Sequence, residues 1–162
     1  MDIYQFLQQH QISYQRFDHP AVYTCEQASR LRPELPGAKC KNLFLRDRKG
    51  RRHFLVVACD HKIVDLKALA EQLGLSRLGL ASAERLKHYL SLEPGAVSLL
   101  AIIHDCQHRV EVVIDRAIWS QEILLCHPLV NTSTLAIPKI AIQTLLTETG
   151  HQPLILDIPA RA

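Results

Sequence analysis

The chain has 162 residues, 48% of them hydrophobic and 22% charged, with a net charge of +3, and these values are typical of a globular protein large enough to bury one core. No apolar run approaches the roughly 18 residues of a membrane span, and the N-terminal residues lack the pattern of a signal peptide. Five widely spaced cysteines without a CxxC pair favour reduced thiols in the cytoplasm over a disulfide framework.

Hydrophobic periodicity and cap residues predict the elements of the first half of the chain. We expect helices over residues 2–9, 24–31 and 64–73 and after Ser82, and strands over residues 13–18, 42–46, 53–59 and 78–81. The second of these helices begins at a Thr24-x-x-Gln27 capping box, and the third ends at Gly74. Residues 54–58 are all apolar, which is typical of a central buried strand.

The second half of the chain is expected to contain mostly strands. We expect strands over residues 97–103, 109–115, 122–126 and 132–137, a helix from Pro138 to Gly150, and an edge strand over 154–158. In residues 109–115 apolar and polar side chains alternate, which predicts a half-buried strand. The irregular order of helices and strands favours an α+β fold, and we expect residues 1–162 to form a single domain.

Basic residues are concentrated around the expected turn between residues 46 and 53. Seven basic residues and one acidic residue, Asp47, lie between Lys39 and Arg52. Such a cluster can contact phosphates. The alternative is a solvated hairpin turn, because Asp47-Arg48-Lys49-Gly50 is a favourable turn sequence.

Histidine and cysteine are frequent enough that a metal site and a thiol nucleophile must be considered. His104, Cys106 and His108 could share one strand face, and Cys59 and His61 another, but neither spacing matches a closed zinc motif. Cys126 is adjacent to His127, yet neighbouring strand residues point to opposite faces. We therefore expect no metal, no cofactor and no cysteine nucleophile.

Polar residues stand at the ends of two apolar runs, about 85 residues apart. Lys41 and Asn42 follow a glycine-containing turn and begin the strand KNLFLRD, and His127 begins the segment HPLVNTST. Taken alone, Lys41 could be a surface lysine and His127 a structural histidine. Asn and Thr residues in turns commonly bond their own backbone.

Together these two segments resemble the YbaK / prolyl-tRNA synthetase insertion-domain family of aminoacyl-tRNA deacylases, most closely the stand-alone branch that removes alanine from proline tRNA. The resemblance implies a curved, mixed and largely antiparallel sheet wrapped by helices. It also implies that Lys41, Asn42 and His127 form the catalytic site.

The same resemblance implies two further sets of residues. Those expected to line the amino-acid pocket are Thr24, Gly95, Val97, Ser98, Asn131, Thr132 and Thr134. Those expected to contact tRNA are Lys39, Arg46, Arg48, Lys49, Arg51 and Arg52. The chain departs from the family pattern near Leu99, where a proline is expected, and at His104, where an asparagine is expected, and these changes bear on pocket size.

The function implied is hydrolysis of the ester between a wrong amino acid, alanine first, and the terminal adenosine of proline tRNA, with the ribose 2′-hydroxyl assisting. The expected partners are aminoacylated tRNA(Pro) and, as a second candidate, prolyl-tRNA synthetase, with no membrane and no DNA. Two alternatives remain open: removal of cysteine, serine or threonine, and a non-catalytic module that binds tRNA or a synthetase.

Overall fold

The computed structural model describes residues 2–22 and 35–161, and the helix expected over residues 24–31 lies outside them. Its helices are α1 (Ile3–Gln9), α3 (Leu66–Gln72), α4 (Ala83–Leu90), α5 (Arg116–Trp119), α6 (Lys139–Thr149) and the 3₁₀ helix η1 (Leu99–His104). Its strands are β1 (Gln15–Asp18), β2 (Cys40–Asp47), β3 (His53–Cys59), β4 (Leu78–Leu80), β5 (Val110–Asp115), β6 (Ile123–Cys126), β7 (Ser133–Pro138) and β8 (Leu154–Leu156).

The larger sheet is mixed and has the strand order β4-β2-β3-β5-β8. Strands β2 and β3 form an antiparallel hairpin in which Cys40 lies opposite Cys59 and Arg46 opposite His53, and β4 is antiparallel to β2. Strands β3, β5 and β8 run parallel to one another. All residues of β3 are buried, as expected for an apolar central strand.

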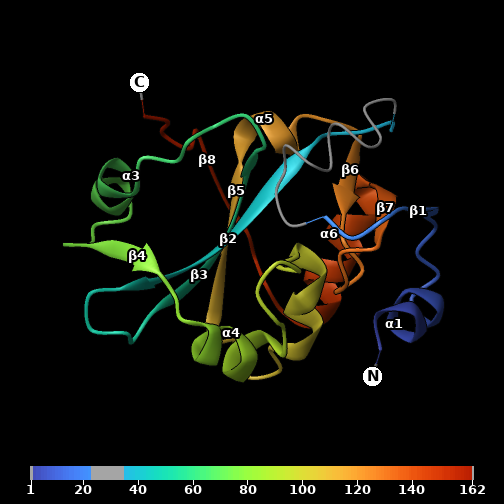
Figure 1. Ribbon diagram of the computed structural model, residues 1–162, viewed down its shortest axis with the longest axis horizontal. Helices are drawn as coiled ribbons and strands as arrows, with labels where there is room; N and C mark the ends of the chain where they lie inside the picture. The colour runs from blue at the N-terminus through green and yellow to red at the C-terminus, as the bar shows by residue number, and fades with distance from the viewer. Residues whose placement is uncertain (1, 23–34, 162) are drawn as a thin grey trace.

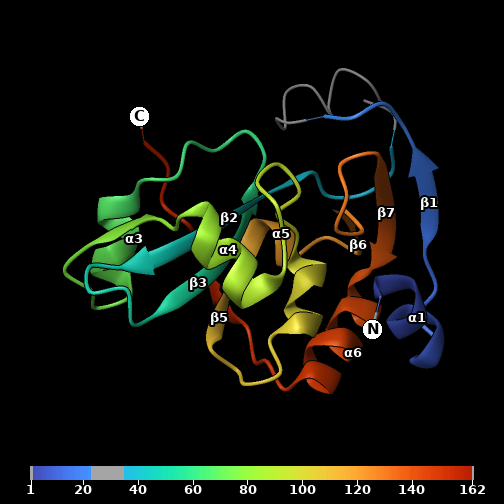
Figure 2. The same ribbon diagram turned by 60° about the horizontal axis from the view of Figure 1, so that its bottom comes forward.

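A smaller antiparallel sheet, β1-β7-β6, stands beside the larger one (Figures 1 and 2). The two sheets meet where the Ala38 amide donates to the Ile123 carbonyl at 2.8 Å and the Leu125 amide donates to the Ala38 carbonyl at 3.1 Å. Gly37 permits this approach, because its φ is 118° and a Cβ there would lie 2.9 Å from Ile123 Cγ2. The mixed α+β architecture predicted from the sequence is confirmed.

The larger sheet separates two clusters of buried side chains. One face packs against α3 and the C-terminal segment, through Leu45, Val56, Leu69 and Ile158. The other face carries the larger cluster, to which α1, α4, η1, α6 and the smaller sheet contribute. No helix in the described ranges has the length and apolar character to traverse a bilayer.

The strand predicted over residues 97–103 is wrong, because this segment forms the 3₁₀ helix η1. Ser98 begins it, and its hydroxyl accepts a hydrogen bond from the Leu100 amide at 3.2 Å. An apolar run this short does not distinguish a buried strand from a buried helix. Because η1 contacts α1, α4 and α6, its side chains are apolar on most sides. The segment therefore lacks the alternation of apolar and polar residues that would distinguish a helix from a strand.

The strand predicted over residues 109–115 is confirmed as β5, but the prediction that it is half-buried is wrong. In β5 only Glu111 is exposed, whereas Val113 and Asp115 are each 1% exposed. The strand lies between β3 and β8, and Val113 packs within the α3-side cluster. Both of its faces are therefore covered, and Asp115 is a buried acid.

Candidate functional site

Lys41 and Asn42 are neighbours in β2, so their side chains point to opposite faces of the sheet. Leu43, two residues after Lys41, packs on the α3 side, and Phe44, two residues after Asn42, packs in the larger cluster. The structure thus brings the two expected catalytic residues to one end of β2 but not to one face. A substrate that contacts both side chains must extend across the end of the strand.

The Lys41 ammonium is held by the turn that follows β3. Lys41 is half-buried, and its Nζ donates a hydrogen bond to the Lys62 carbonyl oxygen at 2.5 Å. The expectation of a solvated surface lysine therefore does not describe this side chain. An ammonium can donate three hydrogen bonds, so two more are left once the contacts within the described residues are counted.

The Asn42 side chain has a buried polar atom for which the described residues supply no hydrogen-bond partner. Among the described residues, nothing hydrogen-bonds its Oδ1, although the atom is inaccessible to solvent. Leaving such a group unsatisfied costs about 1–3 kcal/mol. Such a group is uncommon in folded proteins and calls for an explanation, of which a catalytic role is one.

His127 follows β6 on the same side of the larger sheet as Asn42. Cys40, on the Asn42 face of β2, is a close electrostatic neighbour of Cys126, which directly precedes His127. The His127 Nδ1 lies 3.2 Å from the Ser133 carbonyl oxygen. Because a carbonyl only accepts, Nδ1 carries the proton, and Nε2 of the neutral ring is an acceptor.

Burial determines the charge of the His127 ring. Burial lowers its pKa below the usual value, the bond to the Ser133 carbonyl opposes this effect, and the nearby His19 adds to it. The ring is therefore neutral at pH 7. A neutral imidazole can accept a proton or a hydrogen bond from a substrate at Nε2.

The backbone around His127 is tightly fixed. The Ser98 hydroxyl donates to the His127 carbonyl oxygen at 2.5 Å, and Ser98 is fully buried. Two residues later, Leu129 has a φ of 68°, a left-handed conformation that a leucine adopts only under local strain. Ser98 thus links η1 to the His127 turn, and its hydroxyl is occupied by these bonds.

His19 is a member of this site that the sequence analysis did not single out. Its Nδ1 lies 2.9 Å from the Pro20 carbonyl oxygen, and its Nε2 lies 2.8 Å from the Thr134 hydroxyl. Its backbone amide donates to the Thr132 carbonyl at 2.9 Å. The sequence contains a pattern that could have indicated His19, because His19-Pro20 and His127-Pro128 are its two His-Pro dipeptides. Their histidines are neighbours in the structure.

The remaining residues expected in the pocket are placed differently from one another. Gly95 lies in an exposed turn with a φ of 91°, which favours glycine, and Val97 packs against the larger cluster. Asn131 is half-buried and Thr132 is exposed, both in the turn between β6 and β7. Thr24 lies outside the described residues.

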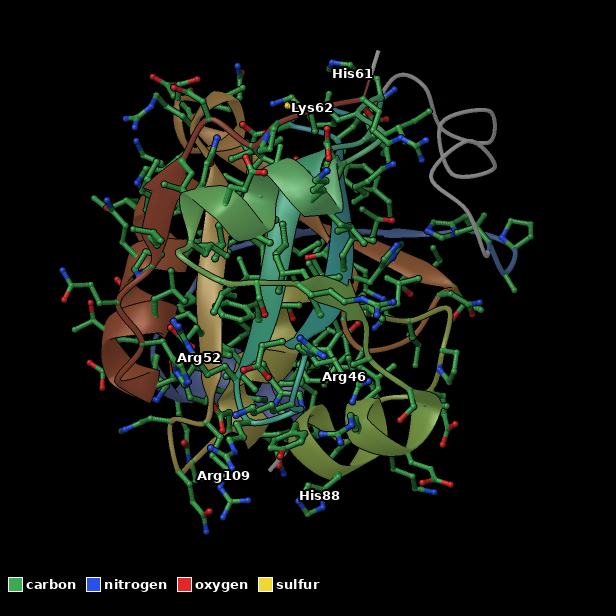
Figure 3. All side chains as sticks on the ribbon, turned by 90° about the vertical axis from the view of Figure 1, so that its left-hand side faces the viewer. Arg46, Arg52, His61, Lys62, His88 and Arg109 are labelled. Atoms are coloured by element: carbon green, nitrogen blue, oxygen red, sulfur yellow. The ribbon has the colours of Figure 1, made fainter. Side chains whose placement is uncertain are left out.

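The residues expected to contact tRNA fall at two ends of the larger sheet. Figure 3 shows Arg46 and Arg52 near one end and Lys62, whose carbonyl holds Lys41, at the other. Arg48, Lys49, Arg51 and Arg52 of the hairpin turn are exposed, and Arg46 is half-buried. Lys39 precedes β2 at the Lys41 end.

Arg52 differs from its neighbours because its charge is already paired. Its Nε and Nη2 donate to the two Glu111 carboxylate oxygens at 2.9 and 2.7 Å, and its guanidinium lies 5.1 Å from the Phe54 ring centroid. A bidentate pair of this kind holds the guanidinium in the sheet. Although Arg52 is exposed, its pairing with Glu111 leaves phosphate contact at the turn first to Arg48, Lys49 and Arg51.

The environments of Cys126 and of residues 104–108 concern the thiol and metal chemistry considered from the sequence. Burial raises the pKa of the Cys126 thiol to about 12, which opposes formation of a nucleophilic thiolate. The strand suggested for residues 104–108 is wrong, since His104 ends η1 and His108 follows a turn with a φ of 55°. Within residues 2–22 and 35–161, no group of three or more His, Cys, Asp or Glu side chains is placed to hold a metal ion.

Comparisons with known proteins agree with this picture. Residues 19–145 match the model of the aminoacyl-tRNA editing domain. The prolyl-tRNA editing protein ProX of Acetoanaerobium sticklandii is 36% identical over 140 residues, covering 86% of this chain and 85% of that protein. The prolyl-tRNA synthetase associated domain-containing protein 1 of Danio rerio is 34% identical over 158 residues, covering 96% of this chain and 85% of that protein.

Solved structures show the same fold at low sequence identity. The crystal structure of a hypothetical protein superposes with a TM-score of 0.74 at 17% identity, over 96% of this chain and 97% of that one. The crystal structure of a candidate trans-editing enzyme for prolyl tRNA synthetase superposes with a TM-score of 0.70 at 16% identity, over 99% of this chain and 96% of that one.

Proposed function

Because this chain belongs to the aminoacyl-tRNA editing domain family, it is an aminoacyl-tRNA deacylase, and we propose that it removes alanine from mischarged proline tRNA. Editing of proline tRNA is supported by the relative named as a prolyl-tRNA editing protein. The choice of alanine is our proposal. The protein would act in the cytoplasm, where tRNA is charged and where its cysteines stay reduced.

The energetics of recognition explain why alanine is the expected error. A synthetase pocket built for proline also admits the smaller alanine, because each missing methylene changes binding by only about 1–3 kcal/mol. A second pocket that admits alanine and excludes proline by size then corrects the mistake. The fixed turn from His127 to Asn131, with Leu129 in a strained conformation, is suited to a pocket of defined size.

The observation that carries the assignment of the site is the unused hydrogen-bonding capacity of Asn42 and His127. The Asn42 Oδ1 is buried without a partner in the described residues, and the His127 ring presents Nε2 as an acceptor. We propose that these two atoms bind the aminoacyl group. The Lys41 ammonium then binds the phosphate or ribose of the terminal nucleotide, which a compact cation suits.

The reaction needs little chemistry from the protein. Water adds to the ester carbonyl, the bond to the ribose oxygen breaks, and that oxygen takes a proton as the amino acid leaves. In our proposal the ribose 2′-hydroxyl helps to orient or deprotonate the water. The turn at Gly95 places backbone amides near η1, where they are candidates to stabilise the developing oxyanion.

A hydrolysis assay with proline tRNA charged with alanine, cysteine or serine tests this proposal. We expect the alanyl ester to be hydrolysed fastest. Faster hydrolysis of the cysteinyl or seryl ester would support a deacylase but contradict the choice of alanine. Absence of hydrolysis of all three, with tRNA still bound, would favour a non-catalytic module.

The aminoacylated tRNA is the partner that the editing domain implies, and we propose prolyl-tRNA synthetase as a second partner. The relative from Danio rerio is named for association with that synthetase. Co-purification of the two proteins, with and without tRNA, tests whether the association is direct.

A further inference from the structure

A buried ion pair lies on the α3 side of the sheet, next to Lys41. The Lys62 Nζ is 2.7 Å from the Asp115 Oδ2, and the two side chains are 20% and 1% exposed. The same ammonium donates to the Ile158 carbonyl at 2.9 Å, and the Asp115 Oδ2 also accepts from the Cys59 amide at 3.3 Å. Asp115 therefore joins the end of β5 to the end of β3 and to the turn that follows.

This ion pair is connected to Lys41 through a single residue. The carbonyl oxygen that receives the Lys41 ammonium belongs to Lys62, whose own ammonium is bound to Asp115. The position of that carbonyl depends on the turn of residues 59–62, which the Lys62 amide closes by donating to the Cys59 carbonyl at 3.1 Å. The bonds of the Lys62 side chain to Asp115 and Ile158 are therefore among the contacts that fix the acceptor of Lys41.

The C-terminal segment holds the same turn from its other side. The Asp65 amide donates to the Pro159 carbonyl at 2.9 Å, and the Arg161 amide donates to the Ile63 carbonyl at 2.7 Å. Val64 and Ala160 form an isolated antiparallel bridge between these segments. Together with the bond to Ile158, these contacts leave the Lys62 backbone little freedom.

Stability alone gives a poor account of this pair. A buried ion pair is often no more stabilising than apolar residues of the same volume, because both charges lose their hydration. The other Asp115 oxygen, Oδ1, is buried and has no hydrogen-bond partner among the described residues. Burial raises the pKa of Asp115, but the Lys62 ammonium and the Cys59 amide outweigh it, so the pKa lies below its usual value and the group stays ionised.

We propose that Asp115 and Lys62 are positioning residues for the deacylase, which fix the Lys62 carbonyl and thereby hold the Lys41 ammonium where it meets the terminal nucleotide. This inference rests on the proposed function, in which Lys41 contacts the substrate. Neither Asp115 nor Lys62 touches the reacting atoms in this account.

The test is a double-mutant cycle measured by single-turnover hydrolysis. Lys62→Met removes the ammonium and keeps the backbone carbonyl, and we expect kcat to fall at least about fivefold with KM changed less. In a Lys41→Ala background the same substitution should have less than about a twofold effect, because the residue that it positions is gone. Lys62→Arg, which can still reach Asp115, should restore most of the rate.

A matched control and a second variant separate positioning from folding. His151→Gln disrupts another buried contact, the 2.8 Å pair of His151 Nε2 and Asp105 Oδ2, and should lower thermal stability while leaving kcat unchanged. If Lys62→Met leaves Asp115 charged and the protein unfolds, the double variant Lys62→Met, Asp115→Asn removes both charges. It should show the same loss of kcat.

The outcomes distinguish this inference from the proposed function. If the wild-type protein hydrolyses none of the charged tRNAs, the proposed function is contradicted. The inference is then tested by labelling Lys41 with an amine-reactive ester. Labelling should be faster in the Lys62→Met variant than in the wild type and in the His151→Gln variant. If the wild type is active, the inference is overturned when Lys62→Met lowers the rate by the same factor with and without Lys41, or does not lower it at all. Unchanged labelling of Lys41 would also overturn it.

Discussion

At the scale of single residues, the environment of His127 determines what its ring can do. Burial keeps the imidazole neutral, and the bond from Nδ1 to the Ser133 carbonyl leaves Nε2 as the acceptor. His19, which directly follows β1, accepts a hydrogen bond from the Thr134 hydroxyl at its Nε2, so this nitrogen already has a partner. Protonation of His127 would remove its only ring acceptor.

The lowered pKa of His127 predicts an acid limb in the pH dependence of kcat/KM. Since the folded pKa lies below about 6.5, the rate should be constant near neutrality and fall as the pH drops through the lowered value. The unfolded state binds this proton more readily, so the stability from this group is complete above about pH 6.5 and declines below it. A limb centred above pH 7, or an identical limb in His127→Gln, would contradict this role.

Lys41 offers a direct test of substrate positioning. Lys41→Ala should lower the single-turnover rate at least about tenfold, which corresponds to about 1.4 kcal/mol of transition-state stabilisation. The protein should stay folded, because the side chain is only half-buried and, in the part of the chain that the structure describes, it is bonded to the Lys62 carbonyl alone. Lys67→Ala, at an exposed position of α3, is the control and should keep the wild-type rate. An unchanged rate in Lys41→Ala would remove this residue from the site.

At the scale of elements, the β2–β3 hairpin separates the reaction from the basic turn. Lys41 lies opposite Ala58 at one end of the hairpin, and Arg46 lies opposite His53 near the turn. Five residues at about 3.3 Å each place the turn some 15 Å or more from Lys41. The turn can therefore contact the tRNA body but not the ester.

Neutralising the exposed part of this turn should affect binding and not chemistry. With Arg48, Lys49 and Arg51 changed to Ser, we expect weaker tRNA binding, a salt dependence reduced by about one unit of slope for each lost phosphate contact, and an unchanged rate at saturation. Arg52→Gln should leave the salt slope as it is, because its guanidinium is bound to Glu111. Retention of both affinity and slope in the triple variant would show that tRNA approaches another face.

The elements also show where reading the sequence succeeds. Strands β2 and β3 and helices α1, α4 and α6 follow from strong local signals, such as the Ser82 cap and Gly150 at the end of α6. The segment η1 was predicted as a strand because a buried apolar run has no period to read. The opposite faces of Lys41 and Asn42 followed from strand alternation alone, but the family resemblance grouped them as a pair.

At the scale of the whole molecule, the parts of the site that could not be predicted depend on non-local pairing. Asp115 meets Lys62 because β5 pairs with β3 in parallel, across a connection that contains α3, β4, α4 and η1. His19 meets Thr134 because β1 pairs with β7. Sequence patterns along one segment carry no information on which distant strand will be its neighbour.

The whole molecule is expected to work without a metal ion. Exhaustive chelation should leave the deacylation rate unchanged, because the proposed reaction relies on Lys41, Asn42, His127 and the ribose hydroxyl. The measurement is the rate of alanine release before and after dialysis against chelator. Loss of activity that added zinc restores would contradict the metal-free reaction.

The central claim is that this fold hydrolyses a mischarged proline tRNA and discriminates against the correct one by the size of its pocket. The most direct measurement compares the rates at which the purified protein releases alanine from Ala-tRNA(Pro) and proline from Pro-tRNA(Pro), at equal tRNA concentrations. We expect rapid release of alanine and release of proline no faster than spontaneous hydrolysis. Equal release of both amino acids, or stable Ala-tRNA(Pro) in the presence of the protein, would contradict it.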